Sequence, residues 1–149
     1  MYSPKLGYQV LISHKVLDLI TFWWKAIWKL TTPPWTKLFF WCILKDKVPT
    51  GEYLMHRAIH GPTWCTLCKN VAESTTHLFL KCTSMIELWQ NISIGTRFLG
   101  TWNGDDIIRA WESWYHRHRG SILQSLPIII CWYLWLARNQ NIFDGKPAS

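Results

Sequence analysis

Apolar residues along this chain recur mostly one helical turn apart, and they seldom alternate with polar residues as they would in a strand. Trp24 and Trp28 illustrate the helical spacing. The pattern predicts a mainly α-helical protein, a small helical domain in which β-branched alternation is scarce. We expect one exception, a short β-hairpin around Cys65 and Cys68.

Proline and capping residues set the expected helix boundaries near the N-terminus. Ser3 and Pro4 form an N-cap and first-turn pair for one helix, and Thr21 is placed to cap the next. The stretch from Thr31 to Pro34 must break that second helix. A third helix begins at Pro34, and because it is apolar almost all round, we expect it at the centre of the fold.

Similar signals mark the middle of the chain. Pro49 stops the third helix, and Thr50 caps a fourth. The expected apolar face of this fourth helix consists of Tyr53, Leu54, Ala58 and Ile59. Further on, Ser84 and Glu87 have the spacing of a capping box and predict the start of another helix.

Two helices are expected in the C-terminal third. Asp105 or Asp106 caps a helix over residues 107–119, which Gly120 can end in the left-handed conformation. The last helix fills the chain from Ser121 to about Ile142.

The uncharged run over residues 120–137 is the longest in the chain, and it raises the question of a membrane. Only twelve of its residues, 126–137, are strongly apolar around Pro127, fewer than the roughly 20 that span a bilayer. We expect a buried core helix and no membrane contact.

Length and charge narrow the class of protein. At 149 residues the chain is about one domain long, so we expect residues 1–149 to form a single domain. Sixteen Lys and Arg against nine Asp and Glu give a net charge of +7, which favours polyanions such as nucleic acid. Lys5, Lys15 and Asp18 interrupt the first apolar positions, so we expect no secretory signal and an intracellular location, nuclear or cytoplasmic.

A cysteine cluster carries the most specific chemistry. Three of the five cysteines and one of the six histidines lie in "WCTLCKNVAESTTHLFLKC", residues 64–82. Cys65 and Cys68 form a C-x2-C pair, His77 follows after eight residues and Cys82 after four more. Such a set can surround Zn(II) as a tetrahedron, and a closed set of four ligands is structural because it leaves no position for substrate. We predict one structural zinc ion.

Two other interpretations of the cluster stay open. The letters "WCTLC" match the W-C-x-x-C of thioredoxin-like redox sites, but those motifs follow a buried strand and open a helix, and neither flank here has that pattern. In the second interpretation His77 and Cys82 are ordinary core residues, and the C-x2-C pair is incidental.

Several motifs in fixed order resemble a known family. "WKAIWKL", "PPWTKLFFW", "VPTGEYLMHR", "CTLC", "ESTTHLFLKC" and "ELW" follow one another as in the reverse-transcriptase zinc-binding domain of plant non-LTR (LINE-type) retrotransposon polyproteins. The strongest likeness covers residues 24–89. It implies zinc ligands at Cys65, Cys68, His77 and Cys82, and an acidic position at Glu73. We expect Glu73 either to orient the His77 imidazole or to lie exposed and inert.

The resemblance does not imply catalysis, because the polymerase is a separate upstream domain in that family. A reverse transcriptase needs an aromatic-x-Asp-Asp turn and a further Asp to hold two metal ions. The one Asp pair, Asp105 and Asp106, follows Gly104 and is explained by helix capping. The nine scattered acidic residues offer no ribonuclease H set. We expect a non-catalytic accessory module.

The resemblance further implies contact with RNA or DNA. The candidate contacts are Arg57, His60, Lys69, His116, Arg117, His118 and Arg119. The last four also suit a structural role, because cations in a last helical turn interact favourably with the helix dipole. Trp35 and Trp64 could stack on bases, but we expect core packing for both.

Two alternatives to nucleic-acid binding stay open. One is a protein-interaction or scaffolding module, which would pack beside a reverse-transcriptase domain or another protein. The other is a fragment of a decayed element without a selected function.

Overall fold

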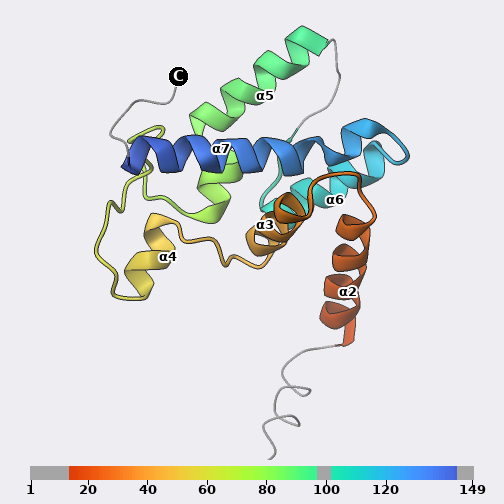
Figure 1. The fold of residues 1–149 in the computed structure, drawn as a ribbon, viewed down its shortest axis with the longest axis horizontal. Coiled ribbons are helices and arrows are strands. Elements are labelled where there is room, and N and C mark those ends of the chain that lie inside the picture. Colours follow the sequence, from red (N-terminus) through yellow and green to blue (C-terminus); the bar gives the residue numbers. More distant parts are fainter. Residues whose placement is uncertain (1–13, 97–101, 144–149) are drawn as a thin grey trace, which may run out of the picture. The chain divides into compact units, whose positions relative to one another are not determined.

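The computed structural model describes residues 14–96 and 102–143, and it divides into two compact units, residues 1–31 and 32–149 (Figure 1). Within the described ranges the elements are helices, and no strand is formed. The prediction of a mainly α-helical protein is therefore confirmed. The expected hairpin is reduced to an isolated antiparallel bridge between Trp64 and Ala72.

The first unit contains the helix α2, His14–Trp28. Thr21 lies in the middle of this helix, so the predicted cap at Thr21 is wrong. Neither Pro nor Gly interrupts the segment, and one interior Thr costs a helix less than about 1 kcal/mol. The rings of Trp24 and Trp28 meet edge to face at 5.2 Å, as their one-turn spacing predicts. The expected cap at Ser3 and Pro4 lies outside the described residues.

In the second unit, α3 spans Pro34–Leu44 and begins at the predicted proline. It ends at Leu44, so the predicted stop at Pro49 is wrong: Asp46, three residues before the proline, already adopts a left-handed φ of 55°. The short helix α4 spans Gly51–His56, and the Thr50 hydroxyl accepts a hydrogen bond from the Tyr53 N–H, as predicted for a cap.

The predicted apolar face of α4 is wrong in its second half. The helix ends at His56, Ala58 has a left-handed φ of 55°, and Ile59 is 51% exposed. The cause is the helix length, because Ala58 and Ile59 lie beyond the last turn.

Next come a π-helical turn, η1, at His77–Lys81 and the helix α5 at Thr83–Thr96. Since α5 already includes Thr83, Ser84 lies inside the helix and the predicted capping box is wrong. The helix α6 spans Ile107–Arg117, with the Asp106 carboxylate accepting from the Arg109 N–H at 2.8 Å. The predicted cap at Asp106 is therefore confirmed. Gly120 is left-handed as expected, with φ 77°, but the helix ends at Arg117, two residues earlier than predicted.

The last predicted helix is split into a 3-10 turn, η2, at Ile122–Ser125 and the helix α7 at Leu126–Phe143. The division falls at Pro127, the second residue of α7. Proline lacks the N–H that a helix interior needs but fits a first turn, so the regular helix starts beside it.

The helix α3 lies next to α7, as Figure 1 shows. The Phe39 ring of α3 meets Trp132 and Trp135 of α7 at 5.3 and 5.7 Å, and Phe40 meets Trp111 of α6 at 4.9 Å. α3 therefore contacts both α7 and α6, as expected of a central helix, but it is not covered all round, because Trp35 and Leu38 are exposed. No helix in the described ranges is long and apolar enough to cross a membrane.

Candidate metal centre

The structure brings the four predicted zinc ligands together. One ligand atom each from Cys65, Cys68, His77 and Cys82 lies within 4.8 Å of all the others. The Cys65 and Cys82 sulfurs are 3.8 Å apart, and Cys68 Sγ is 3.3 Å from His77 Nε2. Two Zn–S bonds of about 2.3 Å at a tetrahedral angle would separate their sulfurs by about 3.8 Å. The cluster fits one zinc ion.

The first two ligands lie on a tight backbone turn. The Cys65 N–H donates to the Val71 carbonyl and the Lys69 N–H donates to the Cys65 carbonyl, both at 2.8 Å. Lys69 closes the turn with a left-handed φ of 59°. The N–H groups of Leu67 and Cys68 point at the Cys65 sulfur, where they stabilise a thiolate. This turn, residues 65–69, is called the zinc turn below.

The other two ligands flank the π-helical turn η1. The Cys82 N–H donates to the His77 carbonyl at 2.6 Å, five residues back, which widens the turn by one residue relative to an α-helix. The three apolar residues between them, Leu78, Phe79 and Leu80, are buried and fix this turn in the core. Cys82 then stands directly before α5, and its sulfur accepts the N–H groups of Ser84 and Met85.

Cys65 and Cys82 share a proton in the metal-free chain. The hydrogen bond between the two sulfurs raises the pKa of Cys65 to about 12, with burial acting in the same direction. The same bond lowers the pKa of Cys82 to about 7, and the N–H groups at the start of α5 help, whereas burial opposes them. Cys82 is therefore the first of this pair to ionise.

Proton release on zinc binding is expected to depend on pH. Zinc requires deprotonated ligands. At pH 8 it displaces a proton from Cys65 but hardly from Cys82, whose pKa is about 7, and at pH 6 it displaces one from both. Acidification should therefore weaken zinc binding and raise the release attributable to Cys82 by roughly one proton. Titration calorimetry in buffers of different ionisation enthalpy measures the total proton release of the four ligands, which should be larger at pH 6 than at pH 8. An equal total at the two pH values would contradict the lowered pKa of Cys82.

The geometry argues against a redox role for the C-x2-C pair. Reactive cysteines of this kind have a lowered pKa at the start of a helix. Here the residues after Cys65 form turns, and the pKa of Cys65 is raised. The hydrogen-bonded partner of the Cys65 sulfur is Cys82, 17 residues away.

Glu73 does not orient His77, and it is not exposed, so both expectations for this residue are wrong. Its side chain is completely buried, and its carboxylate accepts hydrogen bonds from the guanidinium of Arg138 on α7. Arg138 Nε lies 3.2 and 3.1 Å from the two carboxylate oxygens, and the Nη2 group donates to Oε1. A buried carboxylate needs such a partner, and Arg138 provides it from 65 residues away.

Further bonds tie the zinc loop, residues 64–82, to its neighbours. The Gly51 N–H donates to Glu73 Oε1 at 2.9 Å, and a side chain at Gly51 would come within 2.5 Å of the Pro62 carbonyl. On α7, the Asn141 amide donates to the Thr66 carbonyl at 3.0 Å. Sequence reasoning missed Arg138 and Asn141. The available signal for Arg138 was its position as the first charged residue after the apolar run of the last helix.

The predicted nucleic-acid contacts differ in exposure. Arg57, His60 and Lys69 are exposed around the zinc loop. His116, Arg117 and Arg119 are exposed near the end of α6. His118 is a correction, because its side chain is only 9% exposed and its ring lies 4.3 Å from that of Trp114. Burial, with the neighbouring Arg117 charge, lowers the pKa of His118.

The two tryptophans discussed for base stacking are exposed. Trp64 is 60% exposed and Trp35 is 59% exposed, so the expectation of core packing is wrong for both. Trp64 lies at the start of the zinc loop, where its backbone forms the bridge to Ala72 and its ring is left exposed.

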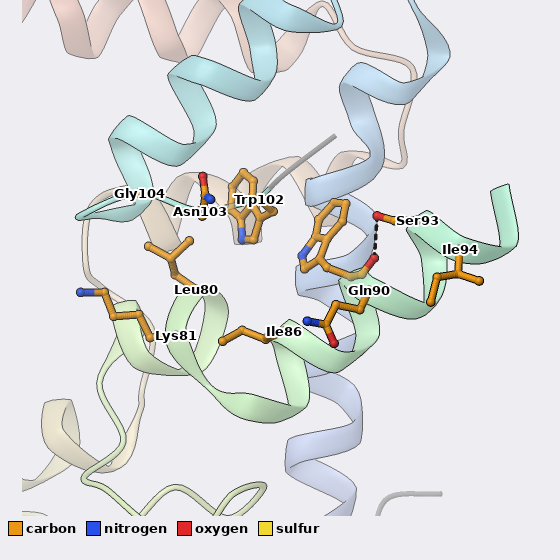
Figure 2. A pocket seen from close by; sticks show the side chains of 10 residues that line it. Leu80, Lys81, Ile86, Gln90, Ser93, Ile94, Trp102, Asn103 and Gly104 are labelled. Atoms are coloured by element: carbon orange, nitrogen blue, oxygen red, sulfur yellow. Dashed lines mark hydrogen bonds between the residues drawn. The ribbon is translucent and has the colours of Figure 1, made fainter. Parts of the chain in front are cut away.

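Two hollows near α5 differ in chemistry. One is a groove of about 610 Å³ between α5 and residues 102–104. Figure 2 shows its lining, which includes Ile86, Ile94 and Trp102. Its lining is mostly apolar and contains none of the zinc ligands or predicted nucleic-acid contacts. A second pocket, of about 650 Å³, is lined by the zinc turn, α5 and α7, and it includes the predicted contact Lys69.

Comparisons with known proteins agree with this site. A family model described as "zinc-binding in reverse transcriptase" matches residues 2–89. The chain is also 24% identical over 151 residues to an Arabidopsis thaliana protein named "Putative ribonuclease H protein". That alignment covers 95% of this chain but only 23% of the relative. No solved structure matches.

Proposed function

Because the chain belongs to the family of zinc-binding domains in reverse transcriptase, we propose that it is a non-catalytic module that contacts RNA or DNA through its zinc loop. The zinc-binding character follows from the family and from the Cys3His cluster. Nucleic-acid contact and the lack of catalysis are the proposed part.

The observation that carries nucleic-acid contact is the surface of the zinc loop. Trp64 is 60% exposed there, and Arg57, His60 and Lys69 are exposed in the same stretch. Residues 57–72 contain no Asp or Glu to repel phosphate. Exposed aromatic rings among cations are the usual surface for single strands, since bases stack while phosphates pair with the cations.

The absence of catalysis is supported by how the acidic residues are used. Asp106 caps α6, and Asp105 pairs with Arg109 at 3.2 Å. The Cys3His cluster, which among the described residues is the group that could hold a metal ion, has no open ligand position for substrate. The ribonuclease in the name of the longer Arabidopsis relative is therefore not part of the function proposed for this chain.

The protein-interaction alternative has one observation in its favour. Trp35 and Leu38, one turn apart on α3, are 59% and 53% exposed. Such a pair suits an apolar contact with a reverse-transcriptase domain or another protein. An apolar interface responds little to salt, whereas phosphate contacts weaken steeply with salt. A nuclear or cytoplasmic location stays a prediction.

We expect Trp64→Ala to weaken binding to a labelled single-stranded RNA or DNA by roughly tenfold, because stacking one base contributes about 1–3 kcal/mol. Lys69→Ala should instead lower the slope of log affinity against log salt by roughly one. Fluorescence anisotropy at several salt concentrations measures both effects. Trp35→Ala, an equally exposed tryptophan outside the loop, is the matched control and should bind like the unmodified chain. The proposal fails if no oligonucleotide binds at low salt, or if Trp35→Ala alone weakens binding.

A further inference from the structure

The second pocket, called the zinc-turn pocket here, joins three segments far apart in the sequence. The zinc turn contributes Leu67 and Lys69, α5 contributes Glu87 and Asn91, and α7 contributes Tyr133 and Asn141. Its volume of about 650 Å³ lies within the range of about 300–1,000 Å³ typical of small-ligand sites. None of the four zinc ligands lines the pocket, but residues of the zinc turn between and beside Cys65 and Cys68 do.

The chemistry of the lining is mixed in a particular way. The Tyr133 ring is 65% exposed and offers a flat face for stacking. Leu67 and Leu88 are half-buried and supply apolar surface to the lining. Glu87 and Asn91 are exposed and add hydrogen-bond acceptors and donors, while Lys69 provides a positive charge at the end of the zinc turn.

These polar groups are available for a ligand. Among the described residues, the structure gives no hydrogen bond or ion pair to the side chains of Lys69, Glu87, Asn91 or Tyr133. Asn141 uses its amide nitrogen for the Thr66 carbonyl, and its oxygen has no bond of this kind. Within residues 14–96 and 102–143, a ligand at these four side chains would therefore displace no hydrogen bond or ion pair.

We propose that the zinc-turn pocket binds one nucleotide of a single-stranded nucleic acid, with the base against Tyr133 and a phosphate at Lys69. This inference rests on the proposed function and names the site where it is carried out. A nucleobase has an apolar face and a polar edge, as this lining requires. A duplex is disfavoured because its base edges are already paired, and a simple phosphate would leave the apolar part of the lining and the Tyr133 ring without a partner.

Glu87 adds a preference among bases. A carboxylate accepts a hydrogen bond from an exocyclic amino group, as it does from the amino group of cytosine. Uracil and thymine lack such a group. Strands of cytosine should therefore bind better than strands of uracil or thymine, and the preference should disappear in Glu87→Ala.

The test uses the full zinc-loaded chain and short labelled oligonucleotides of cytosine or uracil, as RNA and DNA, with a duplex for comparison. Tyr133→Ala should weaken single-strand binding roughly tenfold. The control is Phe143→Ala, which removes another exposed aromatic ring of α7, 78% exposed and outside the pocket. It should bind like the unmodified chain. Zinc content and the unfolding temperature should be equal in all variants because the replaced side chains are exposed.

The outcomes separate this inference from the proposed function. If no oligonucleotide binds, the proposed function fails and the pocket assignment fails with it. If binding depends on Trp64 but Tyr133→Ala and Glu87→Ala bind like the unmodified chain, the pocket assignment alone is overturned. Equal affinity for cytosine and uracil strands would also overturn it.

Discussion

Replacing Arg138 with methionine is expected to lower the free energy of unfolding by about 3–5 kcal/mol, because it leaves the charge of Glu73 buried without its partner. The Glu73 side chain is completely buried, and its remaining hydrogen bond comes from the Gly51 N–H. This loss of stability should exceed that from breaking the exposed Arg109–Asp105 ion pair, because water cannot reach the buried carboxylate and replace the guanidinium. Urea unfolding of zinc-saturated protein, followed by tryptophan fluorescence, measures the change.

Two further variants show whether the pair itself is responsible. Glu73→Gln combined with Arg138→Met removes both charges and should recover much of the loss, since the uncompensated carboxylate is gone. Arg109→Met breaks the ion pair between Arg109 and Asp105, whose side chains are 69% and 88% exposed. It should lower the free energy of unfolding by less than about 1 kcal/mol. A cost for Arg138→Met no larger than that for Arg109→Met would refute a structural role for the buried pair.

Removing zinc should have the largest effect on the zinc loop. Between Cys65 and His77 the chain has little apolar content, so the loop depends on its ligands. Structural zinc binding contributes on the order of 10 kcal/mol in small sites, and a loss of even part of this should lower the unfolding temperature by more than about 10 °C. Chelator treatment and Cys68→Ser should both lower the unfolding temperature by this amount, whereas Cys42→Ser, outside the cluster, should leave it unchanged. Native mass spectrometry and thermal unfolding measure zinc content and stability together, and an unchanged unfolding temperature without zinc would contradict the account.

Features set by neighbouring residues could be predicted from the sequence. The ligand spacing of Cys65, Cys68, His77 and Cys82 is local, and the structure gathers these four side chains. The caps at Thr50 and Asp106 are also local, because each cap depends on a few adjacent residues. The same reasoning failed at Thr21, where a residue able to cap a helix lies within one that nothing interrupts.

Features set by distant residues could not be predicted. The spacing of Glu73 and His77 suggested a contact one turn away, but the partner of Glu73 is on α7. No local pattern indicates that a carboxylate will be covered by a helix 65 residues later. The exposure of Trp64 was missed for a related reason, since composition favours burial of tryptophan and only the folded zinc loop shows which ring is left uncovered.

The bonds from α7 also extend the zinc module beyond the matched region. The family model ends at residue 89, whereas Arg138 and Asn141 hold the zinc loop from residues 126–143. The loop and α7 therefore depend on each other. A chain cut after α5 would lose the partner of Glu73 along with the bond to Thr66.

X-ray absorption at the zinc edge of the purified chain tests the central claim most directly, because it counts the ligands of each kind. The four side chains predict three sulfur neighbours at about 2.3 Å and one nitrogen at about 2.0–2.1 Å, with about one zinc per chain. The spectrum of Cys42→Ser should be identical. A coordination shell of oxygen and nitrogen alone, or a folded chain that holds no zinc, would contradict the assignment of Cys65, Cys68, His77 and Cys82 as the ligands.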